Sequence, residues 1–156
     1  MRLWHQDLIP YLDRQRLLGQ HRECCALRGR GWGKKHSVVD YVFRYDLAHL
    51  YAYHFEVMAE MGRRGYGPDP RWYEKTYCGR SLGYAKLEDV GTWCWDCAGP
   101  VYTEHDDAYM AECLLNLRMK NAELENGVSV SEMLFRLYAR NPDLEIRFKR
   151  KGIEND

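Results

Sequence analysis

The sequence contains no apolar run long enough to cross a bilayer, and its first residues lack the pattern of a secretory signal peptide. It also has no Gly-X-Ser-X-Gly nucleophile motif, no His-Glu-X-X-His zinc helix and no dinucleotide-binding fingerprint. These absences exclude a membrane-spanning protein and several enzyme classes that short motifs define. We therefore expect a soluble, cytoplasmic protein without membrane contacts.

The six cysteines offer one recognisable motif, Cys94-X-X-Cys97, and no second pair at that spacing. The spacing suits zinc, but a zinc site needs two further ligands, which must come from elsewhere in space. Without a secretion signal we expect reduced thiols rather than disulfides. Two interpretations stay open: a structural metal site, and ordinary buried cysteines, which we favour. Residues that can complete a metal site are Cys24, Cys25, Cys78 and His105.

Positive and negative side chains balance to a net charge of zero, but they are unevenly spread along the chain. Residues 1–36 carry eight basic and three acidic residues, and residues 136–151 carry six basic and two acidic ones. Residues 86–132 show the reverse, with ten acidic and three basic residues. This asymmetry favours a protein with one face directed at a polyanion. The alternative is mutual neutralisation between the segments.

Apolar residues recur at three- and four-residue steps in four stretches, which predicts a mostly helical protein. Residues 68–103 are rich in aromatic residues and glycine and are expected to form an irregular insertion, while residues 37–45 can be extended or helical. The predicted fold class is all-α, a compact single domain over residues 1–156. The four expected helices cover 10–28, with a start between Pro10 and Asp13, then 46–64, 106–125 and 129–140.

The segment from Asp13 to Cys24 is the most informative part of the sequence. On a helix, its one internal carboxylate, Glu23, shares a face with Arg16, Gly19 and Gln20. A glutamate among arginines is usually a solvated ion pair. Gly19 favours a functional interpretation, because a glycine inside a helix costs about 1 kcal/mol relative to alanine. We interpret it as a place where another molecule approaches the backbone closely.

Two further polar segments have open interpretations. Residues 104–107, Glu-His-Asp-Asp, can bind a metal or can cap the helix that follows, and we favour the cap. The glycine-rich basic loop over residues 29–36 lacks the serine or threonine of a phosphate-binding P-loop. It is either a flexible loop that contacts a ligand through its backbone or a linker.

The residues from Asp13 to Glu23, above all Gln15, Leu17, Arg22 and Glu23, carry a resemblance to a known family. The resemblance continues through Lys35-His36 and through the helix that ends at residues 60–66, with a weaker echo around His105. Together these segments cover about half of the chain. In them the sequence resembles the pyrimidine dimer DNA glycosylases, the phage endonuclease V type of base-excision enzyme.

This resemblance implies an all-helical DNA glycosylase with associated lyase activity on abasic sites. Its nucleophile would be the α-amine of Met1, with Glu23 as the catalytic carboxylate and Arg22 beside it. The amine would form an imine with the sugar of a damaged nucleotide and cleave the strand by β-elimination, without a metal or other cofactor. We expect a monomer that acts on damaged double-stranded DNA and is nucleoid-associated when bound. The expected DNA contacts are Arg2, Gln15, Arg16, Arg28, Lys34 and Lys35.

The sequence departs from the family pattern in several places. Phage members expose a small residue after methionine removal, whereas the bulk of Arg2 disfavours removal of Met1. Ala26 stands where the family has a second arginine, so Arg28 is expected to substitute for it. The insertion at 68–103 has no counterpart and can either stack on unpaired bases or supplement the core. Two other functions stay open, a non-catalytic nucleic-acid-binding module and a zinc-stabilised interaction protein centred on Cys94 and Cys97.

Overall fold

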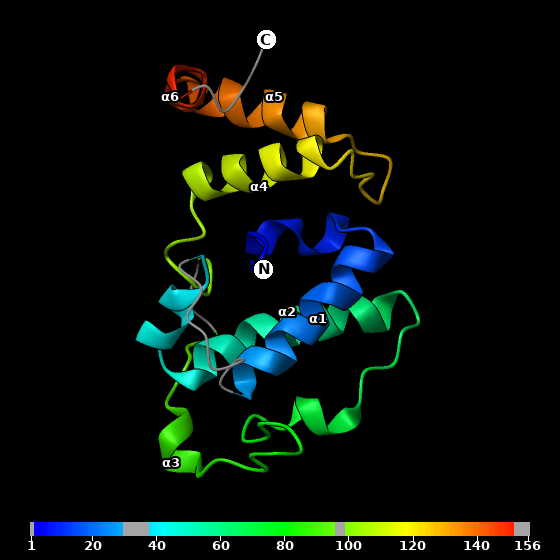
Figure 1. Ribbon diagram of the computed structural model, residues 1–156, viewed down its shortest axis with the longest axis vertical. Helices are drawn as coiled ribbons and strands as arrows, with labels where there is room; N and C mark the ends of the chain where they lie inside the picture. Colours follow the sequence, from blue (N-terminus) through cyan, green and yellow to red (C-terminus); the bar gives the residue numbers. More distant parts are fainter. Residues whose placement is uncertain (1, 30–37, 96–98, 152–156) are drawn as a thin grey trace.

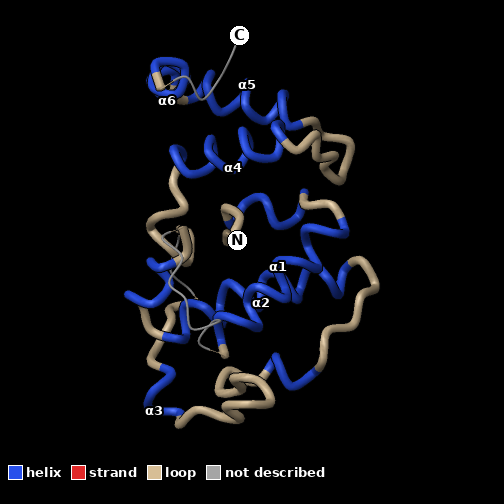
Figure 2. The backbone as a smooth tube through the Cα atoms, in the orientation of Figure 1, coloured by secondary structure: helices blue, strands red, loops and turns tan. Residues whose placement is uncertain are grey.

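The computed structural model describes residues 2–29, 38–95 and 99–151 (Figure 1). These residues form helices and loops without any strand, which confirms the all-α prediction (Figure 2). None of the described helices is long and apolar enough to span a lipid bilayer. The 3-10 helices are η1 (Gln6–Tyr11), η2 (Asp40–Arg44) and η3 (Pro70–Tyr73); the α-helices are α1 (Arg14–Arg28), α2 (Leu47–Arg63), α3 (Leu87–Val90), α4 (Asp107–Met119), α5 (Val130–Arg140) and α6 (Pro142–Arg150).

Short polar side chains start three of the long helices. The Asp13 carboxylate accepts a hydrogen bond from the Arg16 amide at the start of α1. Asp106 and Ser129 do the same for α4 and α5, respectively. Each bond satisfies a backbone N–H that has no partner inside the helix. The cap interpretation of residues 104–107 is therefore confirmed at Asp106.

One helix end agrees with expectation and another differs from it. Helix α2 ends at Arg63, just before the predicted stop at Gly65, whose backbone φ is +83°. Helix α4 ends at Met119, six residues before the expected end at 125, because Asn121 adopts a φ of +52°. The Ala122 and Asn121 amides then bond back to the carbonyls of Leu117 and Arg118, at 3.0 Å each, as in a Schellman motif. Helix α6 was not predicted, although its proline occupies a permitted first-turn position.

The helices form two packed groups with the N-terminal segment between them (Figure 1). Helix α1 packs against α2, and α5 packs against both α4 and α6. The N-terminal segment and η1 lie between the α1–α2 pair and α4. One apolar cluster joins these elements, and its fully buried members include Leu3, Leu8, Leu17, Val57 and Leu114.

Arg28, the last residue of α1, is the most unusual buried side chain. It is only 1% exposed, and its guanidinium donates to the carbonyl oxygens of Trp72, Glu74 and Tyr77 at 2.6, 2.7 and 2.9 Å. It also lies over the rings of Tyr51 and Trp72, at 5.3 and 5.0 Å from their centroids. Arg28 therefore ties the irregular segment that follows α2 to the end of α1.

Several histidines are buried in a neutral state. His54 is fully buried, and His105 is 3% exposed. The His105 ring accepts a hydrogen bond from the Gln6 amide and lies 2.7 Å from the Tyr41 hydroxyl. Burial lowers the pKa of His105 to about 3 and places the pKa of His54 well below its usual value. Protonation of either ring therefore opposes folding.

The free energy of unfolding should fall as the pH drops below the ordinary histidine range. A histidine with a lowered folded-state pKa stabilises the fold above its unfolded pKa of about 6.5 and loses that contribution as the pH falls. Between about pH 7.5 and pH 5.5 the loss is about 1.4 kcal/mol for each strongly shifted histidine, or about 3 kcal/mol for His54 and His105 together. Urea unfolding at the two pH values measures it. The substitution His105→Gln should reduce this loss of unfolding free energy by about half. An identical free energy of unfolding of the unmutated protein at both pH values would show that neither histidine is buried in the neutral state.

Replacing Arg28 by methionine should destabilise the protein strongly, because three buried carbonyl groups lose their donor. We expect a loss of about 3–5 kcal/mol, as for other broken buried charge networks. The matched control is Arg136→Met, since Arg136 lies on α5 with a largely exposed ion pair to Glu132. That substitution should change stability by less than about 0.5 kcal/mol. Equal effects in thermal or urea unfolding would show that Arg28 does not hold the fold together.

Candidate active site

A cleft of about 470 Å³ opens along one face of α1, beside the N-terminal segment and the C-terminal end of α4. It brings together five of the residues predicted from the sequence to act on DNA. These are Arg2, Gln15, Arg16, Arg22 and Glu23. The remaining lining residues are Trp4, Gly19, Gln20, Val38, Asn116 and Lys120.

The periodicity of α1 explains why its residues meet in this cleft. Arg16, Gly19 and Glu23 recur at three- and four-residue steps and share one helix face. The carboxylate of Glu23 is half-buried, with its Oε2 atom shielded from solvent. Arg22 extends into solvent, whereas Arg16 holds Asp13 in an ion pair of 2.8 Å at the start of the helix.

The cleft is electropositive, because four basic side chains and one carboxylate line it. Two of these cations lie over the same ring: the Arg2 guanidinium is 5.7 Å and the Lys120 ammonium 5.9 Å from the Trp4 ring centroid. Charges around a concave surface reinforce one another, because the low-dielectric walls concentrate their field. The arrangement attracts an anion and keeps a single carboxylate among the cations.

Helix α4 supplies two cleft residues that the sequence did not reveal. Lys120 follows the last turn of α4, and Asn116 lies one turn earlier. The Asn116 Oδ1 atom is buried and accepts no hydrogen bond from the residues that the structure describes. Both lie almost 100 residues after α1 in the chain, in a segment dominated by acidic residues. The one available signal was that Lys120 is among only three basic residues in residues 86–132.

The other predicted site residues are placed differently. Arg28 does not line the cleft, and its buried guanidinium is bound to carbonyl groups of the fold. It is therefore a structural residue, and its assignment as a DNA contact is wrong. Met1, Lys34 and Lys35 lie outside the described residues.

One cluster in the described residues has the composition of a metal site. Ligand atoms of His21, Cys25 and His54 lie within 4.8 Å of one another. However, the Arg28 guanidinium lies 3.1 Å from His54 Nδ1 and can only donate, so Nδ1 must accept. The His54 proton is then on Nε2, which lies 2.8 Å from His21 Nδ1 and donates to it. A protonated Nε2 cannot bind a metal, and the adjacent guanidinium repels a cation.

The structure corrects the expectation for the Cys94 motif. Cys94 is disulfide-bonded and exposed, rather than a reduced, buried thiol. In this state its sulfur is not available as a thiolate ligand for zinc. Four of the remaining cysteines are free thiols, namely Cys24, Cys25, Cys78 and Cys113.

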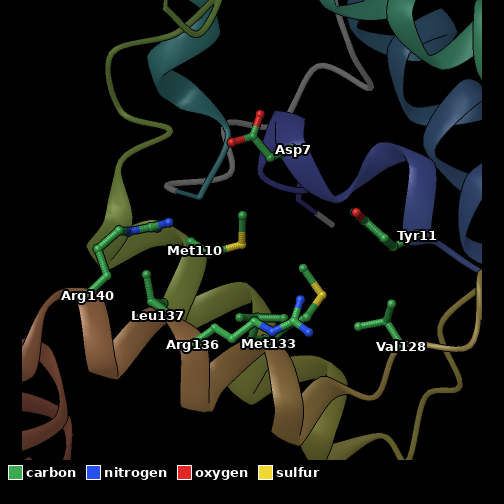
Figure 3. A pocket seen from close by; sticks show the side chains of 9 residues that line it. Asp7, Tyr11, Met110, Val128, Met133, Arg136, Leu137 and Arg140 are labelled. Atoms are coloured by element: carbon green, nitrogen blue, oxygen red, sulfur yellow. The ribbon is translucent and has the colours of Figure 1, made fainter.

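A second hollow, of about 300 Å³, lies between η1, α4 and α5 (Figure 3). Its wall combines the apolar side chains of Met110, Met133 and Leu137 with Arg136 and Arg140. The two arginines are already engaged in ion pairs of 2.8 and 2.9 Å with acidic residues of α5 and α4. None of the predicted site residues lies here, so the cleft on α1 is the candidate site.

Gly19 faces the cleft without an internal steric reason for being glycine. An added Cβ would meet only one atom within 4 Å, the Arg22 Nη2 at 3.8 Å. The substitution Gly19→Ala should therefore raise the free energy of unfolding by about 1 kcal/mol, the usual helix preference for alanine. Gly62→Ala near the end of α2 is the matched control, since a Cβ there meets nothing. Loss of stability in Gly19→Ala alone would reveal a packing role for Gly19.

Comparison with known proteins agrees with the resemblance predicted from the sequence. Residues 1–74 match the family model of the pyrimidine dimer DNA glycosylases. The matched region includes η1, α1 and α2, and therefore the α1 face of the cleft with Glu23. No curated protein and no solved structure matches the chain. Through its first 74 residues, this protein is similar to the pyrimidine dimer DNA glycosylase family.

Proposed function

We propose that this protein removes pyrimidine dimers or a related base lesion from double-stranded DNA and then cleaves the abasic strand. One observation carries the proposal: the basic cleft contains both Glu23 and Arg2, the residue next to the terminal amine. In this proposal, a nucleophilic amine acts beside a carboxylate where an electropositive surface can hold DNA. The family match over residues 1–74 supports the same reaction class.

The proposed nucleophile is the α-amine of Met1. Its reference pKa is about 8, roughly two units below that of lysine, so a substantial fraction is neutral at physiological pH. The neutral nitrogen attacks C1′ of the damaged nucleotide, and the bond from C1′ to the base breaks. Loss of a proton from nitrogen and opening of the sugar ring give a cationic imine. Removal of a proton from C2′ then expels the 3′ phosphate by β-elimination.

Glu23 has two roles in this scheme. Its negative charge stabilises the positive charge that develops on the sugar and on the imine. Its oxygens also accept and return protons as the base and the 3′ phosphate leave. The shielding of Oε2 strengthens both effects, because electrostatic interactions grow as water is excluded. Removing the charge but keeping the shape should therefore abolish chemistry and spare DNA binding.

The cationic side chains position the DNA backbone. Arg2, Arg16, Arg22 and Lys120 surround the carboxylate and can contact phosphates on either side of the lesion. Gln15, exposed in the first turn of α1, supplies a hydrogen-bonding group at the rim. In this scheme a phosphate or sugar of the DNA passes close to the backbone of α1 at Gly19, which explains why this position has no side chain. Gly19→Ala should therefore weaken DNA binding although it stabilises the helix, while Gly62→Ala should not.

The working form that we propose is a monomer acting as a single domain over residues 1–156. The reaction as written uses no metal or other cofactor. The protein would work in the cytoplasm and be nucleoid-associated when bound to DNA. Intact mass shows whether Met1 is retained and therefore which α-amine is available.

Borohydride trapping tests the proposed function. Borohydride reduces an imine to a stable amine, so a covalent protein–DNA adduct reports the intermediate. We expect an adduct with a duplex that contains a thymine dimer and with a duplex that contains an abasic site, but not with undamaged DNA. Glu23→Gln should lower adduct formation on the dimer duplex by at least about 100-fold, since the stabilising charge is lost.

The control for Glu23→Gln is its affinity for the dimer duplex. The dissociation constant should change less than about threefold. An adduct with the abasic duplex alone would retain the lyase chemistry and exclude the dimer as substrate. No adduct with any damaged duplex, from folded protein that still binds DNA, would favour a non-catalytic nucleic-acid-binding module.

A further inference from the structure

Residues 2–5 are largely buried and pair with no β-strand in the part of the chain that the structure describes. Leu3 is fully buried, and Trp4 is 7% exposed. Buried backbone N–H and C=O groups must be paired, because water cannot reach them. Here side chains from three different helices, α1, α2 and α4, provide the partners.

Gln20 of α1 provides two of these bonds. Its Nε2 donates to the Arg2 carbonyl at 3.1 Å, and its Oε1 accepts from the Trp4 amide at 2.6 Å. The side-chain amide thus bonds to residues on both sides of Leu3, as the N–H and C=O of one residue in a neighbouring parallel β-strand would. Gln20 is itself 2% exposed, so both of its bonds are shielded from water.

The phenol groups of Tyr53 and Tyr109 provide the other hydrogen bonds to the backbone of residues 2–4. The Tyr53 hydroxyl of α2 lies 2.6 Å from the Trp4 carbonyl oxygen and 2.8 Å from Gln20 Oε1, and shares its proton between them. The Tyr109 hydroxyl of α4 donates to the Leu3 carbonyl. Burial raises the pKa of both phenols, so both remain donors at physiological pH. The carbonyl groups of Arg2, Leu3 and Trp4 are consequently all satisfied.

We propose that Gln20, Tyr53 and Tyr109 form a clamp that positions the terminal amine for attack beside Glu23. The inference rests on the proposed function and assigns three positioning residues to it. The amine of residue 1 is separated from the Arg2 backbone nitrogen by three covalent bonds, so it lies within about 4 Å of that atom. Fixing the Arg2 carbonyl therefore restricts the region that the amine can reach.

Helix α1 carries both the side chain that holds the Arg2 carbonyl and the carboxylate of Glu23. Gln20 and Glu23 are three residues apart on α1, which places them on adjacent turns with a rise of about 4.5 Å. The residue that holds the N-terminal segment and the residue that stabilises the imine thus belong to one rigid element. Apolar packing of Leu3 alone would bury the segment, but directional bonds also fix its register and direction.

Single-turnover kinetics test the clamp. The variants are Gln20→Met, Tyr53→Phe and Tyr109→Phe, and the rate of borohydride trapping is measured at saturating abasic duplex. A nucleophile misplaced by about 1 Å loses about 100-fold in rate, so we expect a 10- to 100-fold decrease. The dissociation constant for the duplex should change less than twofold, because none of the three side chains is among the proposed phosphate contacts.

Two further measurements separate positioning from general instability. Tyr102→Phe is the matched control: this phenol is also fully buried, but its hydroxyl has no hydrogen-bond partner in the described part of the chain. The Tyr102→Phe variant should form the borohydride-trapped adduct at the wild-type rate. Hydrogen exchange should show a protected Trp4 amide in the wild type and loss of that protection in Gln20→Met, under conditions where core amides of α2 stay protected.

The outcomes distinguish the clamp from the proposed function. Slow trapping with unchanged DNA affinity and an exposed Trp4 amide supports the clamp. Wild-type rates in all three variants would overturn the clamp and leave the proposed function intact. Absence of an adduct in the wild-type protein would overturn the proposed function, and the positioning role with it, even if Trp4 is protected.

Discussion

The burial of one cation, the Arg28 guanidinium, constrains much of this structure. Removing a charge from water is costly unless its hydrogen bonds are satisfied. In the described residues its bonds go to three main-chain carbonyls and to His54, and none goes to a carboxylate. The segment after α2 must therefore turn back to offer those carbonyls. The same cation fixes the tautomer of His54 and its bond to His21, so the α1–α2 interface depends on it as well.

Helix α1 carries three groups of polar residues with different roles. At its C-terminal end Arg28 organises the interior, and in the middle Gln20 holds the N-terminal segment. A third set, Arg16, Arg22 and Glu23, lines the basic cleft with its single carboxylate. Because one rigid helix carries all three groups, the geometry of the cleft follows from the fold rather than from a mobile loop.

The sequence predicted the helices well where caps and periodicity agree, as at Asp13, Ser129 and Gly65, and it predicted the cleft face of α1. The sequence-based prediction failed where contacts between distant parts of the chain determine where a helix ends or which way a side chain points. Periodicity alone does not show that Asn121 ends α4 early, nor that Arg28 points into the core. Asn116 and Lys120 reach the cleft only through the packing of α4 near the N-terminal segment. Gln20 looked like one more polar residue on a basic helix face, because its partners are main-chain atoms that leave no trace in the sequence.

The central claim is that the terminal amine, placed next to Glu23 by the N-terminal segment, is the nucleophile. Peptide mass spectrometry of the borohydride-trapped adduct tests it most directly, after digestion of the DNA to a single nucleotide remnant. We expect the remnant on the α-nitrogen of the first residue, in the peptide that continues into Arg2. A remnant on the side chain of Lys120, the lysine that also lines the cleft, or on Lys34 or Lys35, would contradict the account.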